Sequence, residues 1–240
     1  MTIAVDEKLL REDVVTASAI LFRVGLIDYM GHATQRIPGS DRVYIKPRHS
    51  ESMRVPADLT PDRVLEINLT GEVVEGDEVP PSERFIHTEI YRARPSIGGV
   101  VHTHQVYATA FGSAGREILP ILHVEAPLVH GGVPCYPSSE LIRTPELGAA
   151  VAAALGDKPA CHLQRHGIVT VGRDVREAVV RAIHLERLAR ANLLVTQLGG
   201  GAHVIPAADM ERVTSSMVDY QVRWAYFAKL AEDPSLPANW

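Results

Sequence analysis

The sequence has little of what marks secreted, membrane-spanning or nucleic-acid-binding proteins. Its 240 residues include only two cysteines, Cys135 and Cys161, so no disulfide framework is expected and a reducing compartment, the cytoplasm, is the default. The amino terminus lacks the basic and apolar regions of a signal peptide, and no apolar run approaches the roughly 20 residues that span a bilayer. Lys and Arg number 24 against 29 Asp and Glu, a net charge of −5 without a basic cluster, which argues against nucleic acid or an anionic membrane as the main partner.

The composition is that of a folded enzyme-sized chain. Hydrophobic residues make up 46% and charged residues 22% of the sequence, so a packed core is expected rather than disorder. The length suits one large domain or two small ones. Histidine, with 11 residues, is frequent for this length, and the positions of these histidines carry more information than their number.

Hydrophobic spacing, capping residues and turn signals predict an alternation of helices and strands. We expect helices at residues 7–28, 82–93, 105–112, 144–155, 175–198 and 206–231. We expect strands at residues 31–36, 43–45, 64–69, 73–74, 97–104, 118–123, 132–136, 160–164 and 168–172. Strands in the middle, with helices before, between and after them, predict a layered αβα domain.

The most informative stretch is the predicted strand that ends in His102-Thr103-His104. Side chains alternate between the two faces of a strand, so His102 and His104 are expected to point the same way. Burying two imidazoles side by side is costly unless they share a purpose, and neutral imidazole is a common ligand of divalent metal ions. A lone histidine in a strand usually makes a structural hydrogen bond. The pair, in contrast, predicts part of a metal site.

Two further segments offer ligands that could complete this site. His166 lies at a tight turn between two predicted strands, where it could be aimed at a neighbouring strand. Glu83 is expected in the first turn of the helix that begins after Pro81, with Ser82 as the N-cap. Without further context, the presence of a glutamate at this position is explained by its favourable interaction with the helix dipole. His87, four residues after Glu83, is expected to make a structural hydrogen bond or to orient Glu83.

The segments 81–83, 102–104 and 166–167 occur in the order and rough spacing of the class II aldolase/adducin family, which the chain resembles from about Asp13 to Leu198. The resemblance implies that His102, His104 and His166 bind one divalent metal ion per subunit, and that Glu83 is a ligand or an acid/base beside it. It implies a single domain over residues 1–240, an α/β three-layer αβα sandwich with a central mixed, mostly antiparallel sheet. It also implies a homotetramer with active sites near the subunit interfaces.

The sequence departs from the sugar-phosphate aldolases of the family at the loops that hold phosphate, in residues 31–34, 46–50 and 81–83. The loop 46–50 is still cationic, and Lys46 and Arg48 could clamp a carboxylate. Residues 81–95 and 141–148 resemble the aromatic-acid decarboxylase branch, whose members act on hydroxylated aromatic or pyridine dicarboxylates such as dihydroxyphthalate. The substrate-binding residues expected on this basis are His32, Arg48, His49 and Ser82.

The hypothesis is therefore a metal-dependent carbon–carbon lyase that decarboxylates a hydroxylated aromatic acid, with Glu83 as the catalytic acid/base. Zn²⁺ is the first metal expected, and Mn²⁺, Fe²⁺ and Co²⁺ also suit three histidines with a carboxylate. The alternatives are a class II aldolase acting on a small hydroxy-carbonyl or sugar-phosphate substrate, a non-catalytic scaffold like adducin, and an iron-dependent oxygenase. The expected partner is a small aromatic carboxylate, without nucleic acid or membrane.

Overall fold

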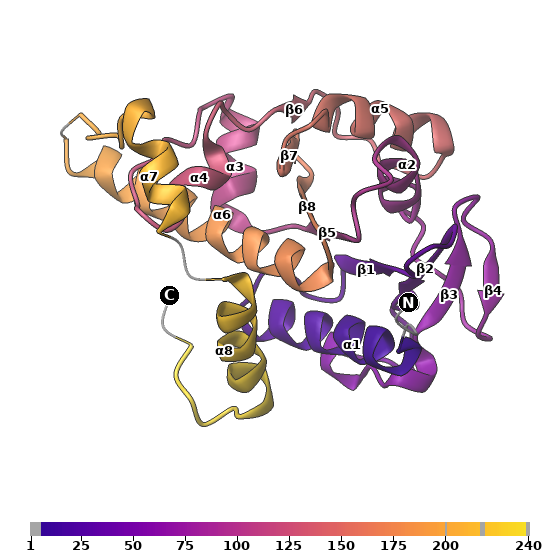
Figure 1. Cartoon of the computed structure of the whole chain (residues 1–240). Coiled ribbons are helices and arrows are strands. Elements are labelled where there is room, and N and C mark those ends of the chain that lie inside the picture. Colours follow the sequence, from indigo (N-terminus) through magenta and orange to yellow (C-terminus); the bar gives the residue numbers. More distant parts are fainter. Residues whose placement is uncertain (1–5, 200, 217–218, 239–240) are drawn as a thin grey trace.

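The computed structural model, which describes residues 6–199, 201–216 and 219–238, contains one eight-stranded sheet (Figure 1). The strands in chain order are β1 (His32–Arg36), β2 (Arg42–Ile45), β3 (Leu65–Asn68), β4 (Val73–Glu75), β5 (Gly99–Thr103), β6 (Cys135–Tyr136), β7 (Ala160–Leu163) and β8 (Gly167–Gly172). Their order across the sheet is β4-β3-β2-β1-β5-β8-β7-β6. Neighbours pair antiparallel except β6 and β7, which are parallel, so the expected mixed, mostly antiparallel sheet is confirmed.

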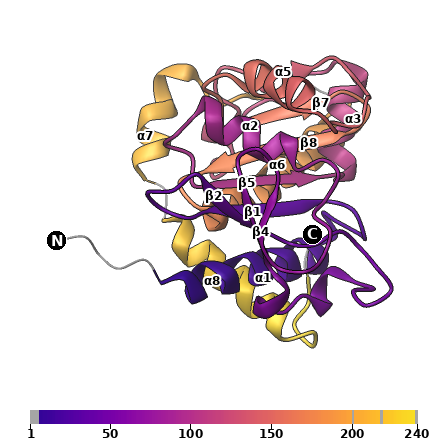
Figure 2. The ribbon, with the colours of Figure 1, turned by 90° about the vertical axis from the view of Figure 1, so that its right-hand side faces the viewer.

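Helices cover both faces of this sheet. The α-helices are α1 (Glu7–Arg23), α2 (Phe85–Ala93), α3 (Val106–Ala114), α4 (Ala126–Val129), α5 (Pro145–Leu155), α6 (Val175–Gln197), α7 (Met210–Ser215) and α8 (Tyr220–Glu232). Short 3₁₀ helices occupy Pro56–Asp58, Pro61–Arg63 and Ala207–Asp209. Figure 2 shows α2 and α5 on one side of the sheet and α1 and α8 on the other, which is the expected αβα layering.

Two apolar cores fill the spaces between the layers. Strand β5 contributes to both, because successive side chains point to opposite faces: Val101 packs with α1, α6 and α8, whereas Val100 packs with α2 and α5. His102 lies on the same face as Val100. The pair of histidines is therefore presented on the α2 side of the sheet, at the end of β5.

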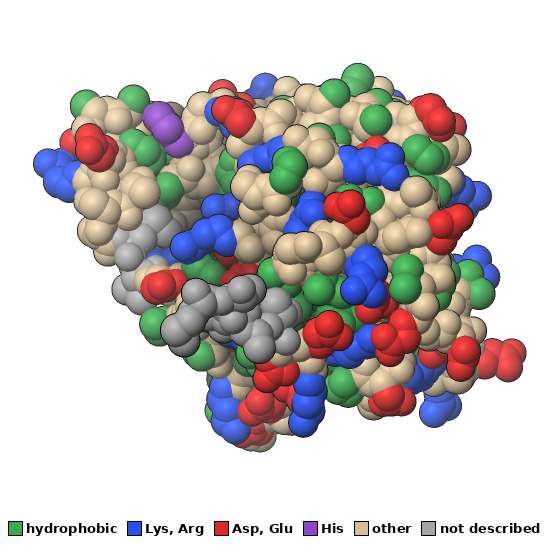
Figure 3. Space-filling model, turned by 45° about the vertical axis from the view of Figure 1, so that its right-hand side comes forward, with side chains coloured by type: hydrophobic (Ala, Val, Ile, Leu, Met, Phe, Trp, Pro, Cys, Tyr) green, Lys and Arg blue, Asp and Glu red, His purple; other side chains and the backbone are tan. Residues whose placement is uncertain are grey.

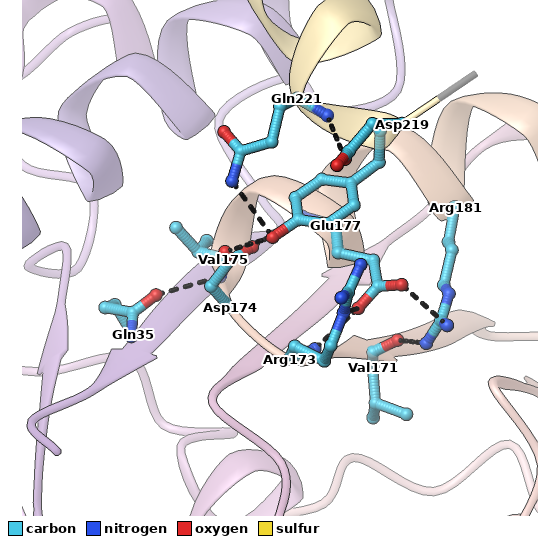
Figure 4. Close-up of polar contacts among 10 residues, drawn as sticks. Gln35, Val171, Arg173, Asp174, Val175, Glu177, Arg181, Asp219 and Gln221 are labelled. Atoms are coloured by element: carbon cyan, nitrogen blue, oxygen red, sulfur yellow. Dashed lines mark hydrogen bonds and ion pairs between the residues drawn. The ribbon is translucent and has the colours of Figure 1, made fainter.

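The start of α6 is fixed by a polar network at the end of β8 that lies away from His166. The side chain of Asp174 accepts hydrogen bonds from the Glu177 amide at 2.8 Å and from the Tyr220 hydroxyl at 2.6 Å. Figure 4 shows Arg173 and Arg181 both directed at the Glu177 carboxylate. These contacts anchor α6 and α8 to the sheet without reaching the histidines.

The predicted strand at residues 118–123 is wrong. Ile118 is buried in the core beneath α6, but the segment has no neighbouring strand. The Asn192 side chain of α6 instead accepts from the Leu119 amide at 2.9 Å and donates to the Leu119 carbonyl at 3.0 Å. A side-chain amide thus replaces the ladder that a strand would need.

Three other predicted boundaries need correction. The first helix ends at Arg23 rather than near residue 28, since Gly25 follows with a φ of 70°. The predicted strand 132–136 is reduced to β6. The predicted helix 206–231 is divided into α7 and α8, because Asp219 starts a new helix by accepting a hydrogen bond from the Gln221 amide at 3.0 Å.

The outer surface carries charges of both signs. On the face drawn in Figure 3, Lys and Arg side chains are interspersed with Asp and Glu. Within the described ranges, no helix has the length and apolar character to cross a membrane.

Candidate metal centre

His102 is held in one orientation by the backbone of the neighbouring strand. Its ring is fully buried, and its Nδ1 lies 2.9 Å from the carbonyl oxygen of Ile168 in β8. A carbonyl only accepts, so Nδ1 carries the proton and Nε2 presents its lone pair. Burial lowers the pKa of His102 well below its ordinary value, so the ring is neutral at pH 7. It is therefore an imidazole oriented and protonated as a metal ligand requires.

His104 and His166 face the same point. His104 follows the last residue of β5, and its Nε2 lies 3.0 Å from the Nε2 of His102. The three imidazole centroids are 4.8 Å (His102–His104), 5.1 Å (His102–His166) and 5.3 Å (His104–His166) apart. The structure thus brings His166, which is distant along the chain, to the neighbouring pair His102 and His104.

The turn that carries His166 has unusual backbone geometry. Arg165 has a φ of 60°, a left-handed conformation that non-glycine residues seldom adopt. At Gly167 an added Cβ would lie 2.4 Å from the Thr103 carbonyl oxygen and 2.9 Å from the His104 ring. Glycine therefore lets this turn pack directly against the end of β5, which explains the His-Gly pair.

Glu83 completes the cluster from a place that differs from the prediction. Helix α2 begins at Phe85, so Ser82 is not the N-cap and Glu83 lies in the turn before the helix. The amide of Ile142 donates to Glu83 Oε1 at 2.9 Å, and His166 Nε2 is 3.4 Å from the same oxygen. Its other oxygen, Oε2, lies 3.9 Å from the His102 ring. The loop before α5 therefore positions this carboxylate, rather than a helix dipole.

Glu83 is ionised over the physiological range. Burial raises the pKa of Glu83, but the nearby His166 and His102 rings and the hydrogen bond from the Ile142 amide outweigh it and lower the pKa to about 2. A carboxylate with this pKa is suited to hold a cation.

The donor set fits a divalent metal ion. One ligand atom from each of Glu83, His102, His104 and His166 lies within 4.8 Å of the others. Both ring nitrogens of His166 are buried without a hydrogen-bond partner in the described part of the chain. Unpaired buried nitrogens are costly, and a cation bound by Nε2 would satisfy one of them. Three imidazoles and one carboxylate suit Zn²⁺ and other first-row ions.

A cavity of about 350 Å³ opens beside Glu83. All four residues expected to bind substrate, His32, Arg48, His49 and Ser82, line it. Arg48 is exposed at the rim, whereas His32 is 5% exposed. The predicted substrate residues and the predicted metal ligands thus meet at one place through Glu83.

Two further cationic residues, Lys46 and Arg143, line the same cavity. Lys46 is only 2% exposed, and its ammonium makes no ion pair among the described residues; its one hydrogen bond is to the Pro47 carbonyl at 3.4 Å. Burial lowers the pKa of Lys46 to about 8. Arg143, just before the cap of α5, also lines the cavity. The sequence predicts that Lys46 could bind a carboxylate, but its burial follows only from the structure.

His87 makes structural hydrogen bonds, the first of its two expected roles, and does not orient Glu83. It is fully buried in α2, and its Nε2 lies 2.6 Å from His32 Nδ1 while its Nδ1 lies 2.8 Å from the Thr34 hydroxyl. Neither contact involves Glu83. The histidine that His87 orients is therefore His32.

Comparison with known proteins identifies the family of this chain. Residues 12–193 match the family described as Class II Aldolase and Adducin N-terminal domain. The chain is 32% identical over 231 residues to a 3,4-dihydroxyphthalate decarboxylase of Arthrobacter keyseri, covering 92% of each protein. It is 30% identical to a 5-methylthioribulose-1-phosphate/5-deoxyribulose-1-phosphate aldolase of Rhodospirillum rubrum, over 85% of this chain and 94% of that protein.

A solved structure shares the fold. The L-fuculose 1-phosphate aldolase from Glaciozyma antarctica PI12 superposes with a TM-score of 0.81 and 24% identity, covering 97% of this chain and 93% of that one. The family match spans most of the chain and both relatives align over nearly their whole length. The chain therefore belongs to the class II aldolase/adducin family.

Proposed function

We propose that this chain is a divalent-metal-dependent carbon–carbon lyase that decarboxylates a hydroxylated aromatic dicarboxylic acid, with a dihydroxyphthalate or a hydroxypyridine dicarboxylate as the substrate class. The named relatives are decarboxylases and aldolases, which are lyases, and this chain is an enzyme of that class. The observation that carries the proposal is the four-residue cluster whose Glu83 lines a cavity, together with Lys46, a buried lysine of the same cavity that has no ion pair among the described residues. A lysine in that position suits a substrate carboxylate.

In the proposed centre, His102, His104 and His166 hold the metal ion, and Glu83 is a fourth ligand or lies beside it. The ion, with Zn²⁺ as our first choice, would supply Lewis-acid stabilisation of the negative charge that develops on the substrate when the bond breaks. The Glu83 carboxylate lies 3.9 Å from His102 and 3.4 Å from His166 and also lines the cavity, which supports charge stabilisation next to this residue.

Glu83 is the proposed proton donor. In the reaction the bond between the ring carbon and its carboxyl carbon breaks, the electron pair stays on the ring, carbon dioxide leaves, and one proton is added to the ring carbon. Because the pKa of Glu83 is lowered to about 2, it is ionised in the free protein and must first take up a proton from water or substrate. The hydrogen bond from the Ile142 amide keeps it in place for both steps.

Cations around the cavity are proposed to bind the substrate carboxylates. Lys46 is buried near the floor, and Arg48 and Arg143 lie towards the opening. Glu83 is the only acidic residue among the lining residues, so the cavity favours an anionic ligand. His49 and Ser82 add polar groups at the wall. Arg48→Ala is expected to raise KM for a dicarboxylate by roughly 10-fold, since it removes one charged hydrogen bond.

The direct test is release of carbon dioxide. Purified protein, stripped with a chelator and reloaded separately with Zn²⁺, Mn²⁺, Fe²⁺ or Co²⁺, is offered a panel of hydroxylated phthalates and pyridine dicarboxylates. We expect metal-dependent carbon dioxide release from at least one hydroxylated dicarboxylate. Cleavage of a sugar phosphate with no turnover of aromatic acids would overturn the proposal.

That last outcome would support an aldolase as the second candidate. It is favoured by the 30% identity to a sugar-phosphate aldolase and by the cationic cavity, which could also hold a phosphate. The two candidates share the metal centre and differ in the ligand of Lys46 and Arg48. Competition by inorganic phosphate against a phthalate for the metal-loaded enzyme would separate them.

We also propose that the 240 residues form one domain, that it assembles as a homotetramer with active sites near subunit interfaces, and that it works in the cytoplasm. Large apolar side chains at the cavity mouth support the assembly: Tyr29 is 55%, Met30 42% and Leu141 42% exposed. A neighbouring subunit would cover them. Light scattering of the metal-loaded protein gives the subunit number, and a monomer of unchanged activity would contradict this part.

A further inference from the structure

A chain of hydrogen bonds leads from the interior of the fold to the cavity. It begins at Tyr91, a fully buried residue of α2. The Tyr91 hydroxyl lies 3.1 Å from the Thr34 carbonyl, 3.3 Å from the Gly98 carbonyl and 2.8 Å from the Thr34 hydroxyl. The Thr34 hydroxyl also lies 3.3 Å from the Val100 carbonyl. Tyr91, Thr34 and Val100 are buried, so the protons of the two hydroxyl groups are assigned among these partners.

The carbonyl oxygens set the direction of the chain. Carbonyls only accept, so the best use of the Tyr91 proton is a hydrogen bond to the carbonyl of Thr34 or Gly98. The Thr34 hydroxyl then gives its own proton to the Tyr91 oxygen or to the Val100 carbonyl. In the opposite direction, the Tyr91 hydroxyl would donate to the Thr34 hydroxyl, which would donate to His87. None of the three carbonyl oxygens would then accept a hydrogen bond from these two hydroxyls.

Two histidines continue the chain. With its proton already used, the Thr34 oxygen accepts from His87 Nδ1–H at 2.8 Å. Both rings are buried, with His87 0% and His32 5% exposed, and neither pairs with a carboxylate among the described residues, so each ring is neutral and has one N–H. His87 Nε2 is therefore an acceptor, and His32 Nδ1–H donates to it at 2.6 Å. It follows that His32 Nε2 has no proton.

The unprotonated nitrogen faces the site. His32 of β1 is in register with His102 of β5, and their ring centroids are 5.3 Å apart. His32 lines the same cavity as Glu83 and Lys46. Nδ1 contacts His87 in α2, so Nε2 is the ring nitrogen left for a ligand in the cavity, and it has no hydrogen-bond partner among the described residues. A lone pair at this place requires a donor.

We infer that His32 is the hydrogen-bond acceptor for a hydroxyl group of the substrate, and that His87 and Thr34 are positioning residues that fix its tautomer. The inference rests on the proposed function for the identity of the substrate and adds a specificity to it. The cavity offers cations to carboxylates and, next to them, a neutral acceptor. It therefore distinguishes a hydroxylated dicarboxylate from the same acid without the hydroxyl.

The tautomer is tested without substrate. In the Zn²⁺-loaded protein labelled with ¹⁵N-histidine, an imidazole nitrogen without a proton resonates far from a protonated one, and His32→Phe assigns the His32 signals by their loss. We expect His32 with Nδ1 protonated and Nε2 not. A protonated Nε2 in the wild type would overturn the inference, whatever the enzyme is found to turn over.

The specificity is tested by binding. Calorimetry gives the ratio of dissociation constants for phthalate and a dihydroxyphthalate in wild type, His32→Phe, His87→Phe and His87→Gln. We expect wild type to prefer the hydroxylated acid by about 2- to 10-fold through this contact, as for one hydrogen bond to a neutral acceptor. His32→Phe and His87→Phe should lose this preference, which is read from the ratio of the two dissociation constants and not from the affinity for either acid alone. His87→Gln should keep it, because its amide oxygen can accept from His32 Nδ1–H.

The outcomes separate this inference from the proposed function. If both acids bind and the ratio is the same in His32→Phe as in wild type, the inference is wrong and the decarboxylase proposal stands. If His87→Phe weakens both acids equally, His87 has a structural role only, and its positioning role is wrong. If neither acid binds to the metal-loaded wild type, the proposed function fails and the hydroxyl assignment fails with it, whereas the ¹⁵N spectrum still decides the tautomer.

Discussion

Replacing Lys46 by Met should make the protein more stable and its substrate binding weaker. Lys46 is 2% exposed, and burial lowers its pKa from 10.5 to about 8. This difference of about 2.5 in pKa corresponds to about 3 kcal/mol by which burying the charged ammonium opposes folding. Met keeps a similar length and removes the charge. The free energy of unfolding at pH 7 should therefore rise by up to about 3 kcal/mol.

The pH dependence of this gain has a definite sign. The folded-state pKa of Lys46 lies below the unfolded value, so the folded protein binds the proton less tightly. The destabilisation is fully present below about pH 8 and disappears as the pH rises towards 10.5. The difference in stability between Lys46→Met and wild type should follow the same course.

Binding should change in the opposite direction. A charged hydrogen bond to a substrate carboxylate contributes about 1.5–3 kcal/mol, so KM should rise roughly 10- to 150-fold in Lys46→Met. In wild type the same interaction should weaken above about pH 8, where the ammonium loses its proton. The KM of the variant should lack this component of the pH dependence.

The assays are urea unfolding followed by circular dichroism, at pH 7 and pH 10, and steady-state kinetics of the Zn²⁺-loaded enzyme from pH 6 to 9. Lys229→Met is the control, because the side chain of Lys229 is 65% exposed on α8 and should change neither quantity. A Lys46→Met variant that is less stable than wild type at pH 7 would refute the burial reasoning. An unchanged KM would remove Lys46 from substrate binding.

Three further predictions concern the metal centre. His166→Ala should weaken Zn²⁺ binding more than roughly 100-fold and abolish turnover, whereas His203→Ala, an exposed histidine, should leave the metal content measured by atomic emission unchanged. Glu83→Gln should keep bound metal but lose turnover by about 100-fold or more; activity near the wild-type rate would exclude Glu83 as the proton donor. Gly167→Ala should lose bound metal, because the added Cβ would lie 2.4 Å from a backbone oxygen. Gly201→Ala is the control, because an added Cβ there meets nothing within 4 Å. Equal metal content in the two variants would contradict the packing of the turn.

The sequence by itself predicted the helices and strands whose ends are set by residues nearby in the chain, because capping and side-chain alternation are local effects. Thr144, Pro145 and Gly156 predicted α5, and the structure places the Thr144 hydroxyl as its cap and Gly156 at its end. Alternation along the apolar strand predicted that His102 and His104 share a direction. At residues 118–123 the apolar run predicts a strand, but the segment has no strand neighbour. The Asn192 side chain of α6 supplies its hydrogen bonds instead.

The site itself depended on contacts between distant segments, and these only the tertiary structure decided. The place of Glu83 is set by the Ile142 amide rather than by helix α2, and no spacing in the sequence relates the two residues. The burial of Lys46 and the pairing of His32 with His87 arise because β1, β2 and α2 pack together. The residue types along the chain determine which chemical groups are available. The burial and orientation of each side chain determine its charge state and its partner, and burial and orientation are set by the packed fold.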